Sequence, residues 1–154
     1  MPEAEMKKDK NDMKNFRMFL FVTTGLFLAA CGTTYTDNAN ILEAERLLSK
    51  KPDSAYMLLN NINEPEKLPE ADYAAWCLHY VHAQYKLYMD IQSDSLIMIA
   101  VDYYKESGLN KYSGISYYML GCVSELLNNF DKAMWAYNMA EKELKNTDET
   151  DIKG

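Results

Sequence analysis

The stretch that decides the fold is Tyr117–Ala140, YYMLGCVSELLNNFDKAMWAYNMA. Its first half carries the pair Leu120-Gly121, and its second half opens at the aromatic residue Phe130. A series of small, aromatic and small residues closes the second half: Ala133, Tyr137 and Ala140. Neither this stretch nor the rest of the chain shows sustained alternation of apolar and polar residues, so we predict no β-sheet.

These positions resemble a tetratricopeptide repeat (TPR), an antiparallel pair of helices of about 34 residues. Tyr117 replaces the usual Trp of that family, Ser124 stands where the family usually has Tyr, and Lys145 stands where it often has Pro. The hairpin is therefore either near an end of an array or degenerate. The resemblance implies an all-α fold, a short right-handed α-solenoid of about three TPR-like hairpins.

Apolar residues at helical spacing extend this pattern upstream and predict three helix pairs, at 39–62, 70–107 and 112–146. Ala100 and Tyr104 precede Ala133 and Tyr137 by close to one repeat, so the second helices of the last two pairs should correspond. Residues 63–69 hold two prolines without periodicity, which indicates a loop. Residues that cap or stop helices mark the other boundaries: Asn38 or Asn40, Pro52, Ser93 with Asp94, and Gly108.

The N-terminal part is typical of a secreted precursor. Residues 18–30 (MFLFVTTGLFLAA) are uncharged and follow Lys14 and Arg17. A run of thirteen uncharged residues is too short to span a hydrocarbon core of about 30 Å, so we expect a signal peptide at 1–30, with translation starting at Met1 or Met13. The alternative is a buried hydrophobic helix with a chance cysteine.

The end of this run, Leu28-Ala29-Ala30-Cys31, resembles the lipobox of bacterial lipoproteins. That resemblance implies cleavage before Cys31 and its modification by lipid, including palmitate, in the cell envelope of a Gram-negative bacterium. No acidic sorting residue follows in Gly32-Thr33-Thr34, so an outer-membrane anchor facing the periplasm is expected. We assign residues 31–38 to a tether, 39–146 to the repeat domain and 147–154 to a flexible tail.

The net charge of the chain limits the classes of partner that it can bind. Without residues 1–30 it keeps eleven basic and nineteen acidic residues, a net charge of −8. An acidic body repels phosphate backbones, so we expect no nucleic-acid partner, and membrane attachment should come from the lipid.

The sequence offers little for catalysis. His79 and His82 have a spacing that could place both on a metal, but no further ligands with suitable spacing follow, so surface or interface histidines are favoured. Cys77 and Cys122 are expected as packed thiols, and no glycine-rich phosphate loop is present. We predict no enzyme activity, no cofactor and no metal site.

The TPR resemblance also implies a concave groove lined by the first helix of each pair. On this chain its residues would be Tyr80, Gln84, Tyr88, Ile115, Tyr118, Cys122 and Glu125. The expected function is a lipid-anchored envelope scaffold that binds a protein or peptide partner. The alternative is the sensory, N-terminal part of a longer membrane-linked TPR signalling regulator, truncated here.

Overall fold

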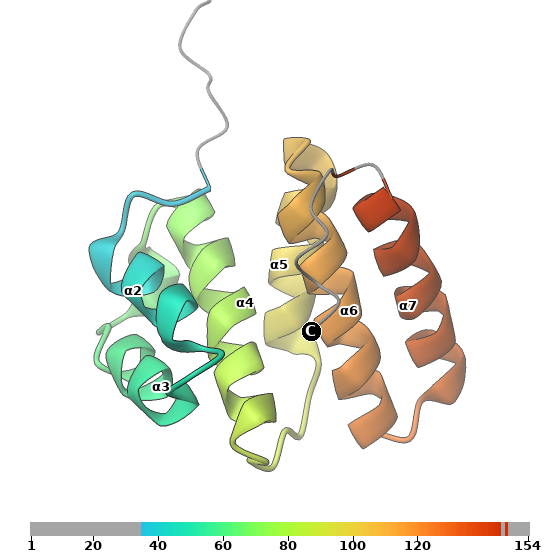
Figure 1. Ribbon diagram of the computed structural model, residues 1–154, viewed down its shortest axis with the longest axis horizontal. Helices are drawn as coiled ribbons and strands as arrows, with labels where there is room; N and C mark the ends of the chain where they lie inside the picture. Colours follow the sequence, from blue (N-terminus) through green and yellow to red (C-terminus); the bar gives the residue numbers. More distant parts are fainter. Residues whose placement is uncertain (1–34, 146, 148–154) are drawn as a thin grey trace, which may run out of the picture. The chain divides into compact units, whose positions relative to one another are not determined.

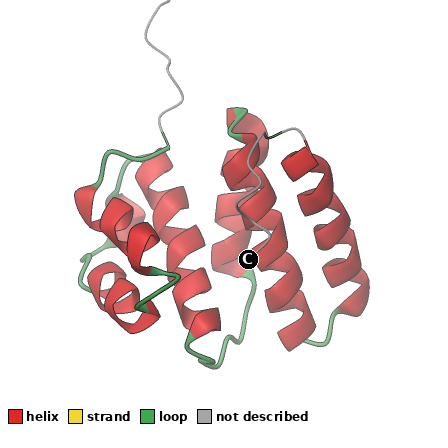
Figure 2. Cartoon of the chain, in the orientation of Figure 1, coloured by secondary structure: helices red, strands yellow, loops and turns green. Residues whose placement is uncertain are grey.

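The computed structural model describes residues 35–145 and 147, and this part of the chain is entirely helical, without strands (Figure 2). It contains six α-helices and one short 3-10 helix, η1 (Pro65–Lys67). The α-helices are α2 (Ala39–Leu47), α3 (Pro52–Asn60), α4 (Glu70–Lys86), α5 (Ser95–Ser107), α6 (Asn110–Leu126) and α7 (Phe130–Lys145). The predicted all-α class is confirmed. The predicted signal peptide, the lipobox and Cys31 lie outside the described residues, as do all residues of the predicted tail except Thr147.

Each helix packs against the one that follows it in the chain, from α2 to α7 (Figure 1). α4 also contacts α2 on one side and α6 on the other, so it has packed neighbours on several sides. Its residues 74–79 are all buried. None of the helices in the described ranges is long and apolar enough to cross a membrane.

The helix boundaries follow local chemistry. The side chain of Asn38 accepts hydrogen bonds from the backbone amides of Asn40 and Ile41, at 3.1 and 3.4 Å, so the predicted cap of α2 is confirmed. Pro52 is the first residue of α3, where its missing amide hydrogen costs no helical hydrogen bond. Gly108 ends α5 with a left-handed φ of 73°, as predicted.

Three boundaries differ from the prediction. Asp94 precedes α5, but its side chain does not cap that helix; it pairs with the ammonium group of Lys132 on α7 at 2.5 Å. The Ser93 hydroxyl instead accepts from the amide of Ser95 at 3.1 Å. The loop at 63–69 contains η1, and α6 begins at Asn110, two residues earlier than expected.

Two glycines of α6 allow α7 to approach closely. A Cβ atom at Gly121 would lie 2.3 Å from Cε1 of Tyr137, and one at Gly114 would lie 2.4 Å from Cγ of Leu144. Real Cβ atoms do not approach other atoms so closely, so both positions need glycine at this helix spacing. Gly121 and Tyr137 therefore meet across the hairpin that the sequence singled out.

Candidate functional site

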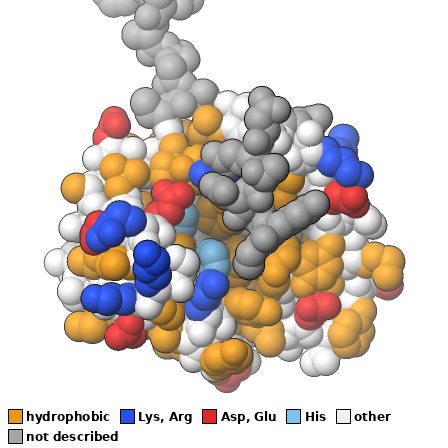
Figure 3. Space-filling view, in the orientation of Figure 1, with side chains coloured by type: hydrophobic (Ala, Val, Ile, Leu, Met, Phe, Trp, Pro, Cys, Tyr) orange, Lys and Arg blue, Asp and Glu red, His pale blue; other side chains and the backbone are white. Residues whose placement is uncertain are grey.

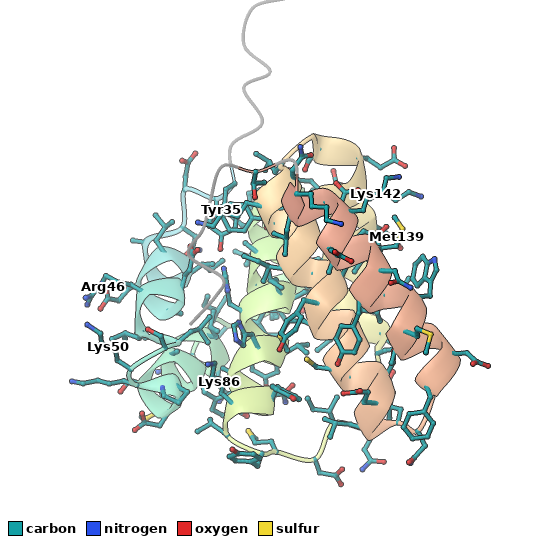
Figure 4. The ribbon with its side chains drawn as sticks, turned by 45° about the vertical axis from the view of Figure 1, so that its right-hand side comes forward. Tyr35, Arg46, Lys50, Lys86, Met139 and Lys142 are labelled. Carbon is teal, nitrogen blue, oxygen red and sulfur yellow. The ribbon has the colours of Figure 1, made fainter. Side chains whose placement is uncertain are left out.

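The candidate site is a cavity between α4 and α6, which we call the α4–α6 cavity. Its volume is about 260 Å³, and its lining residues are His82, Tyr85, Lys86, Tyr88, Tyr118 and Met119. Tyr88 follows α4 in a left-handed conformation, with φ 53°, and its side chain is 96% exposed. Lys86 contributes a positive charge to a predominantly aromatic lining. Figure 4 shows Lys86 near the C-terminal end of α4 and Tyr35 toward its N-terminal end.

A cluster of phenols around a thiol adjoins this cavity. The hydroxyl of Tyr137 donates to Oε2 of Glu125 at 2.9 Å, and Sγ of Cys122 lies 3.7 Å from the same hydroxyl oxygen. The rings of Tyr118 and Tyr137 lie 5.7 Å apart. The electrostatic interaction with the Cys122 thiol group, followed by burial, raises the pKa of Tyr85 and Tyr118, and burial raises that of Tyr137. These phenols therefore stay neutral at physiological pH and keep their hydroxyl donors.

The structure brings together four of the seven predicted groove residues. Tyr88 and Tyr118 line the α4–α6 cavity, while Cys122 and Glu125 lie in the adjoining phenol cluster. Ile115 is half-buried and packs against the core, and Gln84 is also half-buried.

Tyr80 lies apart from these residues. It stacks on Trp76 with ring centroids 4.5 Å apart and on Tyr56 of α3 with centroids 5.3 Å apart. The indole nitrogen of Trp76 donates to the carbonyl of Leu59 at 2.9 Å, so this aromatic stack joins α4 to α3. On α4, His82 and Tyr85 contribute to the cavity.

The two histidines stand in the middle of one face of the domain (Figure 3). His79 is only 3% exposed, so of the two predicted roles, surface or interface histidine, the surface role does not hold for it. Burial, with a smaller contribution from the charge of His82, lowers its pKa to about 3. Burial and the neighbouring Lys86 lower the pKa of His82 to about 4. Both imidazoles are therefore neutral near pH 7. In the described part of the chain, no group of three His, Cys, Asp or Glu side chains is placed to hold a metal ion.

His79 belongs to an aromatic cluster that receives Tyr35, which we call the Tyr35 slot and define by His79, Tyr104 and Tyr112. The ring of Tyr35 stacks on Tyr112 with centroids 3.7 Å apart and planes 3° from parallel. It lies 6.3 Å from the ring of Tyr104 and 5.8 Å, edge to face, from that of His79. The Tyr35 hydroxyl is hydrogen-bonded to Nε2 of His79.

Contacts of the next residues hold Tyr35 in place. The Thr36 side chain is buried and donates to Oδ1 of Asp72 on α4, and the amide of Asp37 reaches the same oxygen at 3.3 Å. Residues 35–38 were assigned to the tether, and this end of it is attached to the helical domain.

Two other surfaces lie away from the α4–α6 cavity. The larger is a cavity of about 720 Å³ between the start of α4 and the end of α5, with Glu70, Asp102 and Glu106 among its lining residues. The other contains the exposed apolar side chains Phe130 and Met134 in the first turns of α7. Phe130 begins α7 as predicted, but 64% of its surface is exposed.

The sequence analysis did not place Tyr35 in an aromatic cluster, nor His82, Tyr85 and Lys86 in the lining of a cavity. One clue was available for Tyr35: it is the only large apolar residue in the polar segment GTTYTDNA at 32–39. Comparison of the chain with protein-family models, with curated proteins and with solved structures finds no match to any of them.

Proposed function

We propose that the described helices form three stacked hairpins of the TPR type, α2–α3, α4–α5 and α6–α7. The order of contacts supports this arrangement, because each helix packs on its successor while α4 touches both α2 and α6. A helix pair cannot bury its apolar face alone, and stacking of neighbouring pairs completes the core. The close approach of Gly121 and Tyr137 is the contact that the TPR-like motif would require.

We propose that this domain is a binding scaffold for a protein or peptide segment, and that the α4–α6 cavity is where the segment binds. The observation that carries the proposal is the exposure of aromatic groups around a preformed cavity: Tyr88 is 96% exposed and Tyr118 is 48% exposed. Tyrosine offers a large rigid surface with a polar tip and is enriched among residues that dominate binding energy. An exposed pair of tyrosines beside one lysine can bind a segment that carries both apolar side chains and hydrogen-bond acceptors.

Partner capture tests this function. Full-length protein, Tyr118→Ala and the matched control Met57→Ala would serve as baits for detergent-solubilised cell envelopes. Met57 lies on α3 and is 64% exposed, so its truncation removes exposed apolar surface away from the cavity. The proposal predicts a partner retained by the wild type and by Met57→Ala but lost with Tyr118→Ala. If no captured protein depends on Tyr118, this use of the cavity is refuted.

We further propose that the scaffold is a lipoprotein of the outer membrane, facing the periplasm, as the motif Leu28-Ala29-Ala30-Cys31 suggests. Mass spectrometry of the mature N-terminus checks this directly, with an acylated Cys31 as the expected result. Cys31→Ser should release the protein from the membrane fraction. An unmodified N-terminal residue other than Cys31 would contradict the proposal.

A further inference from the structure

Tyr35 is bound by the helical domain much as a ligand would be. It lies before α2 and belongs to no helix, yet its ring is half-buried against residues of α4, α5 and α6. Displacing it would break no helical backbone hydrogen bond. The Tyr35 slot is therefore a preformed aromatic site whose present occupant is a side chain of the same chain.

We propose that the Tyr35 slot is a binding subsite for a hydroxylated aromatic side chain, and that Tyr35 occupies it in place of a tyrosine of the partner. This inference rests on the proposed scaffold function and deepens it, because it names the side chain that the partner presents. A partner segment in the α4–α6 cavity would place its tyrosine in the slot and displace Tyr35.

The chemistry of the slot selects a phenol over a plain ring. The parallel face of Tyr112 provides a stacking surface for any aromatic ring, whereas Nε2 of His79 provides a hydrogen-bond partner for a hydroxyl group. His79 is neutral, and its Nδ1 atom is buried with no hydrogen-bond partner. A ring without a hydroxyl would leave Nε2 with Oε2 of Glu45, 4.0 Å away and beyond hydrogen-bond distance, in place of a hydrogen-bond partner, and a buried unpaired polar atom is costly.

The slot and the α4–α6 cavity are close along α4. His79 is in the slot and His82 lines the cavity, and residues three apart lie on the same side of a helix. One bound segment can therefore reach both places.

The test uses p-cresol, which is the side chain of tyrosine, and toluene, which lacks only the hydroxyl. Both would be titrated calorimetrically into full-length Tyr35→Ala, wild type and Met57→Ala. We expect p-cresol to bind Tyr35→Ala at a single saturable site, roughly two- to tenfold more tightly than toluene, as a net hydrogen bond allows. Wild type and Met57→Ala should bind it at least about tenfold more weakly, because the tethered Tyr35 competes at a high effective concentration.

The inference is overturned if folded Tyr35→Ala binds no p-cresol, binds toluene equally well, or binds no better than the wild type. Should Tyr35→Ala fail to fold, p-cresol must restore folding in a saturable way, and absence of rescue counts against the slot. The variant Tyr35→Phe gives a second measurement, in which the NMR signals of His79 report displacement of the residue 35 ring by p-cresol. The phenylalanine ring should be displaced about two- to tenfold more readily than the tyrosine ring of the wild type. No difference would refute the role of the hydroxyl.

The p-cresol titration tests the slot and the partner-capture experiment tests the scaffold function, so either one can fail while the other succeeds. If p-cresol does not bind but capture depends on Tyr118, the slot is excluded and the scaffold function stands. If p-cresol binds but no Tyr118-dependent partner is found, the slot remains a phenol site and the function assigned to the cavity is excluded.

Discussion

Replacing Gly121 with alanine should push α6 and α7 apart at the point where they are closest. The new Cβ atom would lie 2.3, 2.5 and 2.8 Å from three ring atoms of Tyr137, so relief of the clash requires the ring to move by roughly 1 Å to reach ordinary contact distance. The ring cannot move freely, because its hydroxyl is bonded to Glu125 at 2.9 Å.

The expected cost follows from three contributions. Overpacking of this kind typically costs about 1–3 kcal/mol, and weakening of the Tyr137 hydrogen bond adds about 1 kcal/mol. The higher helix propensity of alanine offsets about 1 kcal/mol. We therefore expect Gly121→Ala to lower the free energy of unfolding by about 1–3 kcal/mol, measured by urea denaturation with an unchanged slope.

A double-mutant cycle with Tyr137→Ala isolates the contact. Without the ring, Gly121→Ala should become neutral or stabilising by up to about 1 kcal/mol, because only the propensity difference remains. If Gly121→Ala is equally destabilising in both backgrounds, the Tyr137 ring is not the reason for glycine at this position, and the reasoning is refuted.

Three further predictions concern other contacts. Gly114→Ala should cost less than Gly121→Ala in the same urea assay, because its Cβ would meet Leu144, a half-buried side chain in the last turn of α7; an equal or larger loss would contradict this. Stability should be highest above about pH 6.5 and fall as the pH decreases, because unfolding raises the pKa of His79 from about 3 and that of His82 from about 4 to 6.5, so that each imidazole takes up a proton. His82→Gln should remove about 2 kcal/mol of the difference between pH 7 and pH 5, and an unchanged pH profile would exclude a buried neutral imidazole. A double-mutant cycle on Lys132 and Asp94, which are 29% and 28% exposed, should give a coupling of up to about 1 kcal/mol that weakens with salt; zero coupling at low salt would show that this pair is incidental.

The helical boundaries were largely predictable because single residues with strong local preferences mark them. Pro52 begins α3, Gly108 ends α5 in a left-handed conformation, and Asn38 caps α2. The range 70–107 holds α4 and α5 as predicted. Asp94 was misassigned because sequence alone does not show that Lys132, distant in the chain, competes for its carboxylate.

The candidate site was harder to predict, and the reason lies in α4. A helix that is exposed on one side reveals its orientation through its polar face, but α4 is buried on several sides and carries apolar residues around most of its circumference. The register of this helix therefore had to come from family resemblance. Successive residues of a helix differ in direction by about 100°. The register taken from the family resemblance directed Tyr80, rather than His79, toward the groove. This choice turned the predicted surface of α4 toward α3. On α6 the better-preserved motif fixed the orientation, and Tyr118, Cys122 and Glu125 lie together.

The attachment of Tyr35 has a consequence for how the domain unfolds. In a stack of hairpins that touch only their neighbours, an end hairpin can open while the others stay folded. Here Tyr35, which precedes α2, stacks on Tyr112 of α6, and the Tyr112 hydroxyl also reaches Glu45 of α2 at 3.4 Å. Opening α2 and α3 would therefore also break contacts with α6. Amide hydrogens of α2 and α3 should then exchange with opening free energies similar to those of α6 and α7, as in one cooperative unit, and Tyr35→Ala should make α2 and α3 open more readily than α6 and α7.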